Sequence, residues 1–480
     1  MPPLKILIVG AGVCGPALAA LLRRVEDEVE DEGSAAYDIT VIERAPGLRE
    51  TGLQIDIRAQ GIAIARKMRV LEAIRSRAVP ESGVAFVDER GRAFATFGRN
   101  DSGHGAQNLT SEYEIIRGDL VDVLYRASLG IPLDKDERLD GNGNGKGEEG
   151  GKTATRMPQT TSSANVRYLF DTTIASLAQD SDSVAVTFSD GREARYDLVV
   201  AADGQSSRTR RAVLSAAENA AAFRSLGLFS ALYLVPRGPG DDSWMNWHVL
   251  PGRRVVITRS ANSSKARTQV YMNIVAKGTT SASQGDDDTH GVSAAVASGS
   301  TAAQREAFAR AFADQLQQQH GVGGRVGRLV EAMPAPEDVY VTEIGQVRCE
   351  RLVVGRVVLL GDAGYCPSPI SGMGTTLGLT GAYVLAGELA RRRKGKGKGD
   401  IEGALRAYEK GVRPFVKRAQ MLLPGTPGAL YAESRWGVWL VTTVIWLVAK
   451  SRILDLLLRV WPEDAGGLRL PEYPELKLED

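Results

Sequence analysis

Cysteine and histidine are scarce in this chain. Its 480 residues include three cysteines, Cys14, Cys349 and Cys366, and four histidines. Three widely spaced cysteines do not build a disulfide framework, and without a C-x-x-C pair they indicate no zinc site. The sequence therefore favours a reducing compartment, the cytoplasm, and predicts no bound metal.

The net charge is also close to zero, and the chain has no long apolar run. Lys and Arg number 59 against 58 Asp and Glu, so the formal charge of +1 creates no global field that would attract nucleic acid. Residues 436–449 are nearly uncharged but fall short of the roughly 20 apolar residues that span a bilayer. We predict no nucleic-acid partner and a buried or interfacial helix at 436–449. Peripheral membrane contact through this helix is the less favoured alternative.

The chain does have ample apolar mass. Hydrophobic residues make up 43% and charged residues 24%, which is ordinary for a globular protein with a large core. A chain of 480 residues is longer than one ordinary core requires, so two packed domains are expected.

A glycine-rich turn lies close to the N-terminus. Gly10, Gly12 and Gly15 fit the pattern G-x-G-x-x-G between a predicted strand at 6–9 and a predicted helix at 16–24. In such a turn the first glycine permits the bend and the second lets the backbone approach a pyrophosphate. The third lets helix and strand pack closely. The helix N-terminus attracts the anion. The turn predicts binding of an ADP moiety, which FAD and NAD share.

Glu43 is the expected acidic partner of this turn. It ends a second predicted strand at 39–42, where its carboxylate can accept hydrogen bonds from a ribose, and Arg44 follows it in the candidate cofactor site. In the usual dinucleotide-binding unit the acidic residue follows the last glycine by about 20 positions, and Glu43 lies farther from Gly15 than that. The acidic run at 26–32, interpreted as a solvated loop, accounts for the excess.

Two later segments each run from a predicted strand into an acidic turn. The strands are expected at 198–202 and 357–360. The turns contain these residues: Asp203, Gly204, Ser207 and Arg210 in the first, and Gly361, Asp362 and Ala363 in the second.

In this order, the three motifs resemble those of the class A flavoprotein monooxygenases, the para-hydroxybenzoate hydroxylase-like family. The resemblance covers residues 1 to about 390, and residues 52–58 are similar to the branch of tetracycline-inactivating and fungal secondary-metabolite monooxygenases. It implies an α/β fold, in which a Rossmann-like FAD-binding domain contains an inserted antiparallel β-sheet substrate domain. A C-terminal helical segment follows.

The expected domain boundaries follow from this organisation. Further predicted strands at 255–259 and 269–275 indicate the antiparallel sheet. The expected parts are the FAD-binding domain at 1–80, 111–210 and 341–400, the substrate domain at 81–110 and 211–340, and C-terminal helices at 401–480. Two polar stretches without periodicity, 134–164 and 279–300, are expected to be mobile insertions.

The resemblance also implies roles for individual residues near the flavin. Asp362, with Ala363 beside it, is implied to bind the ribityl and phosphate region of FAD. The isoalloxazine ring is implied to lie against these residues: Pro369, Gly372, Met373 and Gly374. A helix beginning at these glycines, predicted over 376–393, would present N–H groups that favour the anionic reduced flavin.

Arg117 matches the R-x-x-L arginine that contacts FAD in the family, and a surface arginine at a helix start is the alternative. The family usually reads G-D-A-A-H, but this chain has Gly364 and Tyr365 at the last two positions. No histidine is therefore expected beside the flavin.

Acid and base candidates are few. Three of the histidines lie in polar stretches and are expected to face solvent: His104, His290 and His320. His248 shares one face of a predicted strand with Trp244 and Asn246, so we include this face as a candidate substrate contact. Core packing or surface exposure of these side chains is the alternative. No Ser-His-Asp or Cys-His arrangement is visible.

The family resemblance implies a reaction. NADPH or NADH reduces FAD, O2 then forms a flavin C4a-hydroperoxide, and a buried site protects it while a small-molecule substrate is oxygenated. The expected substrate is a mid-sized cyclic or aromatic metabolite, with a role in secondary metabolism. An FAD oxidase or dehydrogenase on the same fold, and a membrane-attached flavin-binding protein, remain alternatives.

Overall fold

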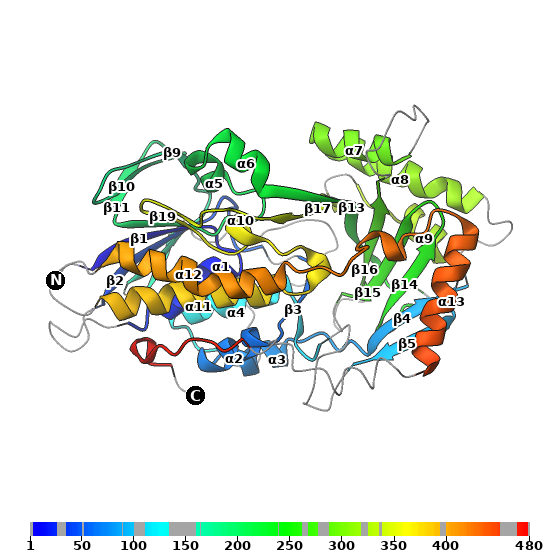
Figure 1. Cartoon of the computed structure of the whole chain (residues 1–480), viewed down its shortest axis with the longest axis horizontal. Helices are drawn as coiled ribbons and strands as arrows, with labels where there is room; N and C mark the ends of the chain where they lie inside the picture. Colours follow the sequence, from blue (N-terminus) through cyan, green and yellow to red (C-terminus); the bar gives the residue numbers. More distant parts are fainter. Residues whose placement is uncertain are drawn as a thin grey trace, which may run out of the picture.

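The structure is a computed structural model in which two large sheets lie side by side along the long axis of the molecule (Figure 1). The described residues are 3–25, 35–49, 52–88, 90–99, 111–133, 160–163, 165–238, 240–261, 267–276, 288–317, 325–335, 338–393, 400–451 and 468–478. The acidic run at 26–32 lies outside them, as do His104 and His320.

The first sheet, here called the FAD sheet, has β1 (Leu4–Val9) at its centre. Its order is β18-β19-β12-β1-β2-β8-β7. The partners are β2 (Tyr37–Ile42), β7 (Thr160–Ser163), β8 (Val166–Leu169), β12 (Leu198–Ala201), β18 (Val353–Val354) and β19 (Val357–Leu359). The five inner strands are parallel. Both faces of a parallel sheet are covered, which explains the apolar runs of β1 and β12.

Helices cover one face of the FAD sheet. Figure 1 shows α1 (Cys14–Leu22), α4 (Arg117–Leu129), α11 (Gly374–Arg392) and α12 (Ile401–Ala419) together on this side. The other face packs against a three-stranded sheet: β9 (Ile174–Gln179), β10 (Val184–Phe188) and β11 (Glu193–Tyr196). Because α12 lies along α11 and shares its core, it belongs with the FAD sheet rather than with a separate C-terminal segment.

The second sheet, here called the substrate sheet, is mainly antiparallel. Its order is β17-β13-β16-β15-β14-β4-β5, with β14 and β4 as the parallel pair. The strands are β4 (Gly83–Val87), β5 (Ala93–Gly98), β13 (Phe223–Pro236), β14 (Trp244–Leu250), β15 (Arg254–Ser260), β16 (Arg267–Val275) and β17 (Tyr340–Val347).

Three helices cover one face of the substrate sheet, here called the helix face. They are α7 (Asp288–Ser298), α8 (Thr301–Gln317) and α9 (Arg325–Glu331), and they bury Val292, Phe308 and Leu329 against the strands. The expectation of a mobile loop over 279–300 is therefore wrong for its second half. The apolar residues Val292 and Ala295 of α7 gain a buried surface from α8, which local composition does not reveal.

The opposite face of the substrate sheet, here called the junction face, is partly covered by α13 (Arg435–Ser451). Ile445 and Ala449 of α13 pack beside β4, β5 and β14, whereas Trp436 is 68% and Trp439 59% exposed. The helix predicted at 436–449 is present, but none of its residues is fully buried. Within the described ranges, no helix combines the length and apolarity needed to cross a membrane.

Short elements connect the two sheets. The pair β3 (Gln54–Asp56) and β6 (Glu114–Ile116) lies between them (Figure 1). The remaining helices are α2 (Gln60–Lys67), α3 (Leu71–Ser76), α5 (Arg208–Val213), α6 (Ala216–Ala222) and α10 (Asp362–Tyr365), with 3-10 turns η2 (Pro369–Ser371), η3 (Gly428–Leu430) and η4 (Pro474–Leu476).

Candidate cofactor and substrate site

The glycine turn between β1 and α1 leaves no room for side chains. Gly10 has a φ of 110°, and a Cβ there would lie 2.7 Å from the carbonyl oxygen of Ala202. A Cβ on Gly15 would lie 2.0 Å from the carbonyl oxygen of Gly10. These contacts fix the turn with its backbone at the helix N-terminus, as a pyrophosphate site requires.

Arg117 lies over this turn. A Cβ on Gly12 would meet its guanidinium at 3.0 Å, and Gly52 packs against its stem. The backbone N–H of Arg117 donates to Leu53, which holds the start of α4 beside β3. The structure thus brings the R-x-x-L arginine to the predicted turn, at the start of α4, and its contact with FAD stays a prediction.

Glu43 ends β2 beside the same turn. Its two carboxylate oxygens accept the backbone N–H groups of Ala11 and Ala45, each at 3.0 Å. These bonds orient the carboxylate and leave lone pairs for a further donor such as a ribose hydroxyl. Arg44 is exposed to solvent.

Asp203 holds the first acidic turn together, and its predicted place in the cofactor site stays a prediction. Its carboxylate accepts hydrogen bonds from the Ser207 hydroxyl at 2.5 Å and from the Thr209 backbone at 3.1 Å, so it holds the start of α5. Arg210 donates to the carbonyl of Ala363 at 2.8 Å. The motif therefore connects the two acidic turns, and Gly204, with a φ of 82°, lies in the open part of the loop.

Asp362 begins α10 at the end of β19. Burial raises the pKa of its carboxyl, while Cys366 and Arg117 oppose this shift. Cys14 lies beside it, and its sulfur occupies space that a Cβ on Gly361 or Gly378 would fill, at 2.5 and 2.7 Å. Burial, then Asp362, raises the pKa of Cys14 to about 12, with Arg117 acting in the opposite direction. The sequence offered no signal for this packing role of Cys14.

The loop from Pro369 to Gly374 leaves an open cradle. The position of a Cβ on Gly372 is 4.0 Å from the Arg58 guanidinium, and that on Gly374 is 4.0 Å from Pro367, with nothing nearer. The Arg58 backbone and the Thr376 hydroxyl exchange two hydrogen bonds of 2.9 Å. Free space and helix N–H groups therefore coincide at the start of α11, beside Met373.

Tyr365 explains the departure from the family motif. Its ring is buried, its hydroxyl pairs with Tyr408 at 3.0 Å, and Tyr408 donates to the carbonyl of Leu359. The hydroxyl lies where a Cβ on Gly381 would be, at 2.0 Å. Tyr365 is thus part of the packing between α10, α11 and α12.

The three side chains of β14 that were predicted as candidate substrate contacts lie on the helix face. In an antiparallel pair, directly opposite residues share a face. His248 is opposite Val256, which packs on the helix face, and Asn246 is opposite Thr258, which contacts Arg325 of α9. Trp244 shares this alternation, so all three side chains point away from the junction face. Alternation identifies a shared face but not which face meets the other sheet.

His248 fits core packing. It is 2% exposed, and its Nε2 has no partner among the described residues. Burial lowers its pKa to about 3, and Arg325 lowers it further, with Asp88 and Asp241 acting in the opposite direction. His248 is therefore neutral at physiological pH.

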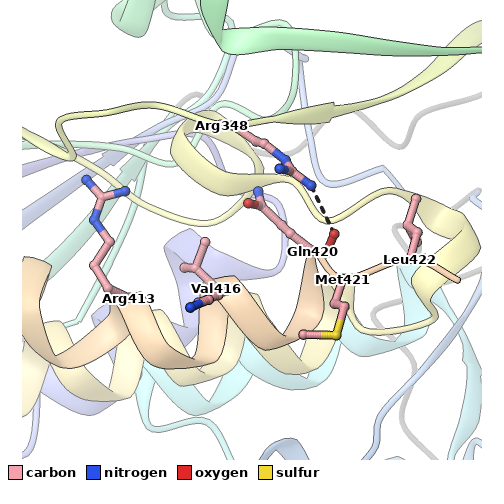
Figure 2. Close-up of a pocket in the computed structure, with 7 residues that line it drawn as sticks. Arg348, Arg413, Val416, Gln420, Met421 and Leu422 are labelled. Carbon is pink, nitrogen blue, oxygen red and sulfur yellow. Dashed lines mark hydrogen bonds between the residues drawn. The ribbon is translucent and has the colours of Figure 1, made fainter. Parts of the chain in front are cut away.

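A hollow of about 470 Å³ lies at the C-terminal end of α12 (Figure 2). Its lining residues are Arg348, Arg413, Val416, Lys417, Gln420, Met421 and Leu422. None of the predicted site residues lines it. Gln420 connects the hollow to the segment just before the cradle, because its amide donates to the carbonyl of Cys366 at 3.3 Å.

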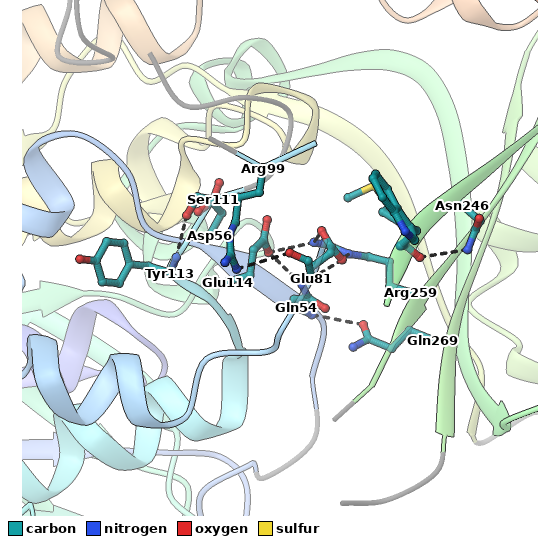
Figure 3. A network of polar contacts seen from close by, with 12 residues as sticks. Gln54, Asp56, Glu81, Arg99, Ser111, Tyr113, Glu114, Asn246, Arg259 and Gln269 are labelled. Carbon is teal, nitrogen blue, oxygen red and sulfur yellow. Dashed lines mark hydrogen bonds and ion pairs between the residues drawn. The ribbon is translucent and has the colours of Figure 1, made fainter. Parts of the chain in front are cut away.

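Buried charges connect β3 and β6 to the junction face (Figure 3). Arg259 of β15 donates to both carboxylate oxygens of Glu81 at 2.8 Å and lies 2.9 Å from Glu114. The Gln54 amide donates to both carboxylates at 3.2 Å. Figure 3 shows Asn246 apart from this group. Sequence patterns did not predict this network of buried charges, because its residues come from separate elements.

We call these residues the junction cluster: Gln54, Asp56, Glu81, Glu114, Arg259 and Gln269. Burial raises the pKa of Glu81, whereas Arg259 lowers it. Burial alone would lower the pKa of Arg259, but Glu114 and Glu81 hold it well above its usual value. Burial and Glu114 raise the pKa of Asp56 to about 7 against the opposing effect of Arg58.

The residues present fit an FAD molecule. The glycine turn and Glu43 suit the ADP half, Arg117 and Asp362 lie beside it, and the cradle before α11 has open space. The fold and this site therefore define a protein of the flavin-binding α/β class.

Comparison with known proteins agrees. The sequence profile of the family described as "FAD binding domain" matches residues 3–422. The chain is 34% identical to the FAD-dependent monooxygenase asL6 of Sarocladium schorii over 99% of both chains. It is 31% identical to the flavin-dependent monooxygenase eupH of Phoma sp over 98% of both. The chain belongs to this FAD-binding family, in its class A flavin monooxygenase branch.

Solved structures share the fold. Tetracycline destructase Tet(51) has a TM-score of 0.65 and 24% identity, covering 98% of this chain and 100% of its own. HpxO of Klebsiella pneumoniae, solved with FAD and uric acid, has a TM-score of 0.59 and 19% identity, covering 95% of this chain and 96% of its own. The predicted fold class is confirmed.

Proposed function

We propose that this protein is an FAD monooxygenase that uses NAD(P)H and O2 to oxygenate a mid-sized cyclic or aromatic metabolite. The substrate would be held between the flavin cradle and the junction face of the substrate sheet. The similarity to the fungal monooxygenases supports this reaction and a role in secondary metabolism. The three cysteines, all without disulfides, support the cytoplasm as the compartment.

The observation that carries the proposal is the convergence of separate segments on one site. Gly12 and Arg117 meet at the turn, Asp362 lies beside Cys14, and the Arg58 backbone holds the start of α11. Bound FAD would supply the redox chemistry, taking electrons from the reduced nicotinamide and passing them to O2. The protein would contribute binding, orientation and the exclusion of water.

The chain's own groups have definite tasks in this proposal. The N-terminus of α1 and the bare glycines would hold the pyrophosphate. The N–H groups at Gly374 and the following residues would stabilise negative charge on the bound ring. His248 is not assigned as an acid or base, because it faces the helices.

The test is direct. The purified full-length protein should carry FAD and consume NADPH or NADH in the presence of a substrate from an aromatic and polycyclic panel. Mass spectrometry under ¹⁸O2 should then find one labelled oxygen atom in the product.

Product formation without label would assign an oxidase or dehydrogenase instead. Absence of bound flavin, even after incubation with FAD, would reject both. Lipid flotation of the full chain should leave it unbound, and retention on vesicles would favour the membrane-attached alternative.

A further inference from the structure

We propose that the junction cluster recognises a neutral substrate bearing hydroxyl and carbonyl groups and disfavours carboxylates. This inference rests on the proposed function and specifies its substrate class. It is carried by the position of the cluster, its unpaired atoms and its charge balance.

The cluster extends from the flavin cradle to the junction face. Arg58 is hydrogen-bonded to Thr376 at the start of α11, and Asp56 pairs with its guanidinium. In the same strand β3, the backbone N–H of Gln54 donates to Gln269 of β16 at 3.3 Å. One short strand therefore connects the two surfaces proposed to enclose the substrate.

Two buried polar atoms of the cluster have no partner among the described residues. They are Oε1 of Gln54 and Nε2 of Gln269. Gln54 is 6% and Gln269 3% exposed, and the Asp56 side chain 9%. An unpaired buried polar atom is costly because it has lost its water, so a site of this kind gains affinity when a ligand satisfies it.

The unpaired atoms define the complementary ligand. The Gln54 oxygen requires a hydroxyl or amine donor, and the Gln269 nitrogen requires an acceptor such as a carbonyl. Asp56 can accept from a hydroxyl, or donate to a carbonyl when it is protonated. A cyclic compound with adjacent hydroxyl and ketone groups provides both kinds of partner.

The two cations paired with the carboxylates of the cluster are already engaged. Arg259 is shared between Glu81 and Glu114, and Arg58 is paired with Asp56. Arg99 donates to the backbone carbonyl of Glu81 at 3.4 Å. A carboxylate would lose its hydration and meet the like charges of Glu81 and Glu114, whose counter-charge Arg259 they already share, which is unfavourable.

A matched ligand pair tests this charge preference. The full-length FAD-loaded protein is titrated with 2,4-dihydroxyacetophenone and with 2,4-dihydroxybenzoate at pH 8, followed by flavin absorbance and by calorimetry. The two probes share the dihydroxylated ring and differ in the ketone and the carboxylate. The ketone should bind at least about tenfold more tightly, as expected for a site of buried hydrogen-bonding groups.

Two variants identify the atoms responsible. Gln269→Glu replaces the unpaired donor by an acceptor and should weaken ketone binding at least about tenfold. Gln304→Glu makes the same change on α8 and should have no effect. In Glu81→Gln/Glu114→Gln, Arg259 lacks its counter-charges, so the preference should shift toward the benzoate.

The outcomes separate this inference from the proposed function. Equal or tighter binding of the benzoate, no binding of either probe, or unchanged ketone binding in Gln269→Glu would overturn the inference. The ¹⁸O2 experiment would still stand in each case. Calorimetry keeps the comparison independent of flavin content, and a protein that binds no FAD fails the proposed function first.

Discussion

The two large sheets of this molecule build their sites by different means. The FAD sheet is largely parallel, and the turn that begins its site brings backbone groups close together at Gly10 and Gly15. The substrate sheet is largely antiparallel, and its junction face contributes long polar side chains such as Arg259 and Gln269. The turn depends on the absence of side chains at its glycines, and the junction face depends on the presence of side chains.

This difference determines how each site responds to change. A glycine position tolerates nothing larger because backbone atoms are the neighbours. A buried ion network tolerates removal of all its charges better than removal of one. Substitutions on the two sides should therefore fail in distinguishable ways.

The largest effect is expected at Gly15. In Gly15→Ala the new Cβ would lie 2.0 Å from the Gly10 oxygen, so helix and strand must separate. FAD affinity should fall at least tenfold, about 1.4 kcal/mol or more, in a flavin fluorescence titration. Gly291→Ala, where a Cβ meets nothing within 4 Å, is the matched control. Unchanged affinity in Gly15→Ala would contradict the close packing.

The next effect concerns the junction cluster. Arg259→Met leaves Glu81 and Glu114 buried without a cation and should reduce the free energy of unfolding by about 3–5 kcal/mol, measured with urea. The triple variant Glu81→Leu/Glu114→Leu/Arg259→Met should recover most of this loss. Arg310→Met breaks an exposed pair with Glu306 and should cost less than about 1 kcal/mol. Equal losses for Arg259→Met and Arg310→Met would show that the network is solvated.

A pH-dependent effect is expected at His248 on the helix face. Because its folded pKa of about 3 lies below the unfolded value of 6.5, protonation favours the unfolded state. The contribution is fully present above pH 6.5 and is lost toward pH 3 by about 1.4 kcal/mol per pH unit. Between pH 7.5 and 5, the wild type should lose roughly 1–2 kcal/mol more than His248→Leu. If the wild type and His248→Leu lost the same free energy of unfolding between these two pH values, His248 would not be buried in its neutral form.

The smallest effect is expected at Tyr365. Tyr365→Phe removes one buried hydroxyl, while Tyr408 keeps its bond to the carbonyl of Leu359. The unfolding free energy should fall by about 0.5–1.5 kcal/mol, with FAD affinity unchanged. A loss of flavin in this variant would instead place Tyr365 in the cofactor site.

The sequence predicted the FAD sheet well because its determinants are local. The strand at 6–9 and the helix at 16–24 correspond to β1 and α1, and that at 376–393 to α11. Glycines that must lie next to backbone, such as Gly10 and Gly15, form a motif of fixed spacing. Arg117 lies over the same turn, and its predicted contact with FAD stays a prediction.

The substrate side was harder to predict because its determinants are distant in sequence. Strands such as β15 and β16 were expected, but alternation alone left open which face of β14 meets the helices. Nothing near Glu81 or Arg259 indicates that they meet, since the partners come from different elements. The same reason hid the packing that makes α7 a helix.

The chain crosses between the sheets repeatedly. It leaves the FAD sheet for β4 and β5, returns for α4, builds β13 to β17, and returns for α11 and α12. It then crosses once more to α13, and Leu468 again contacts Gln60 of α2. Most contacts therefore join residues distant in sequence, which predicts slow folding. Neither sheet corresponds to a continuous segment that could be cut out and expressed alone.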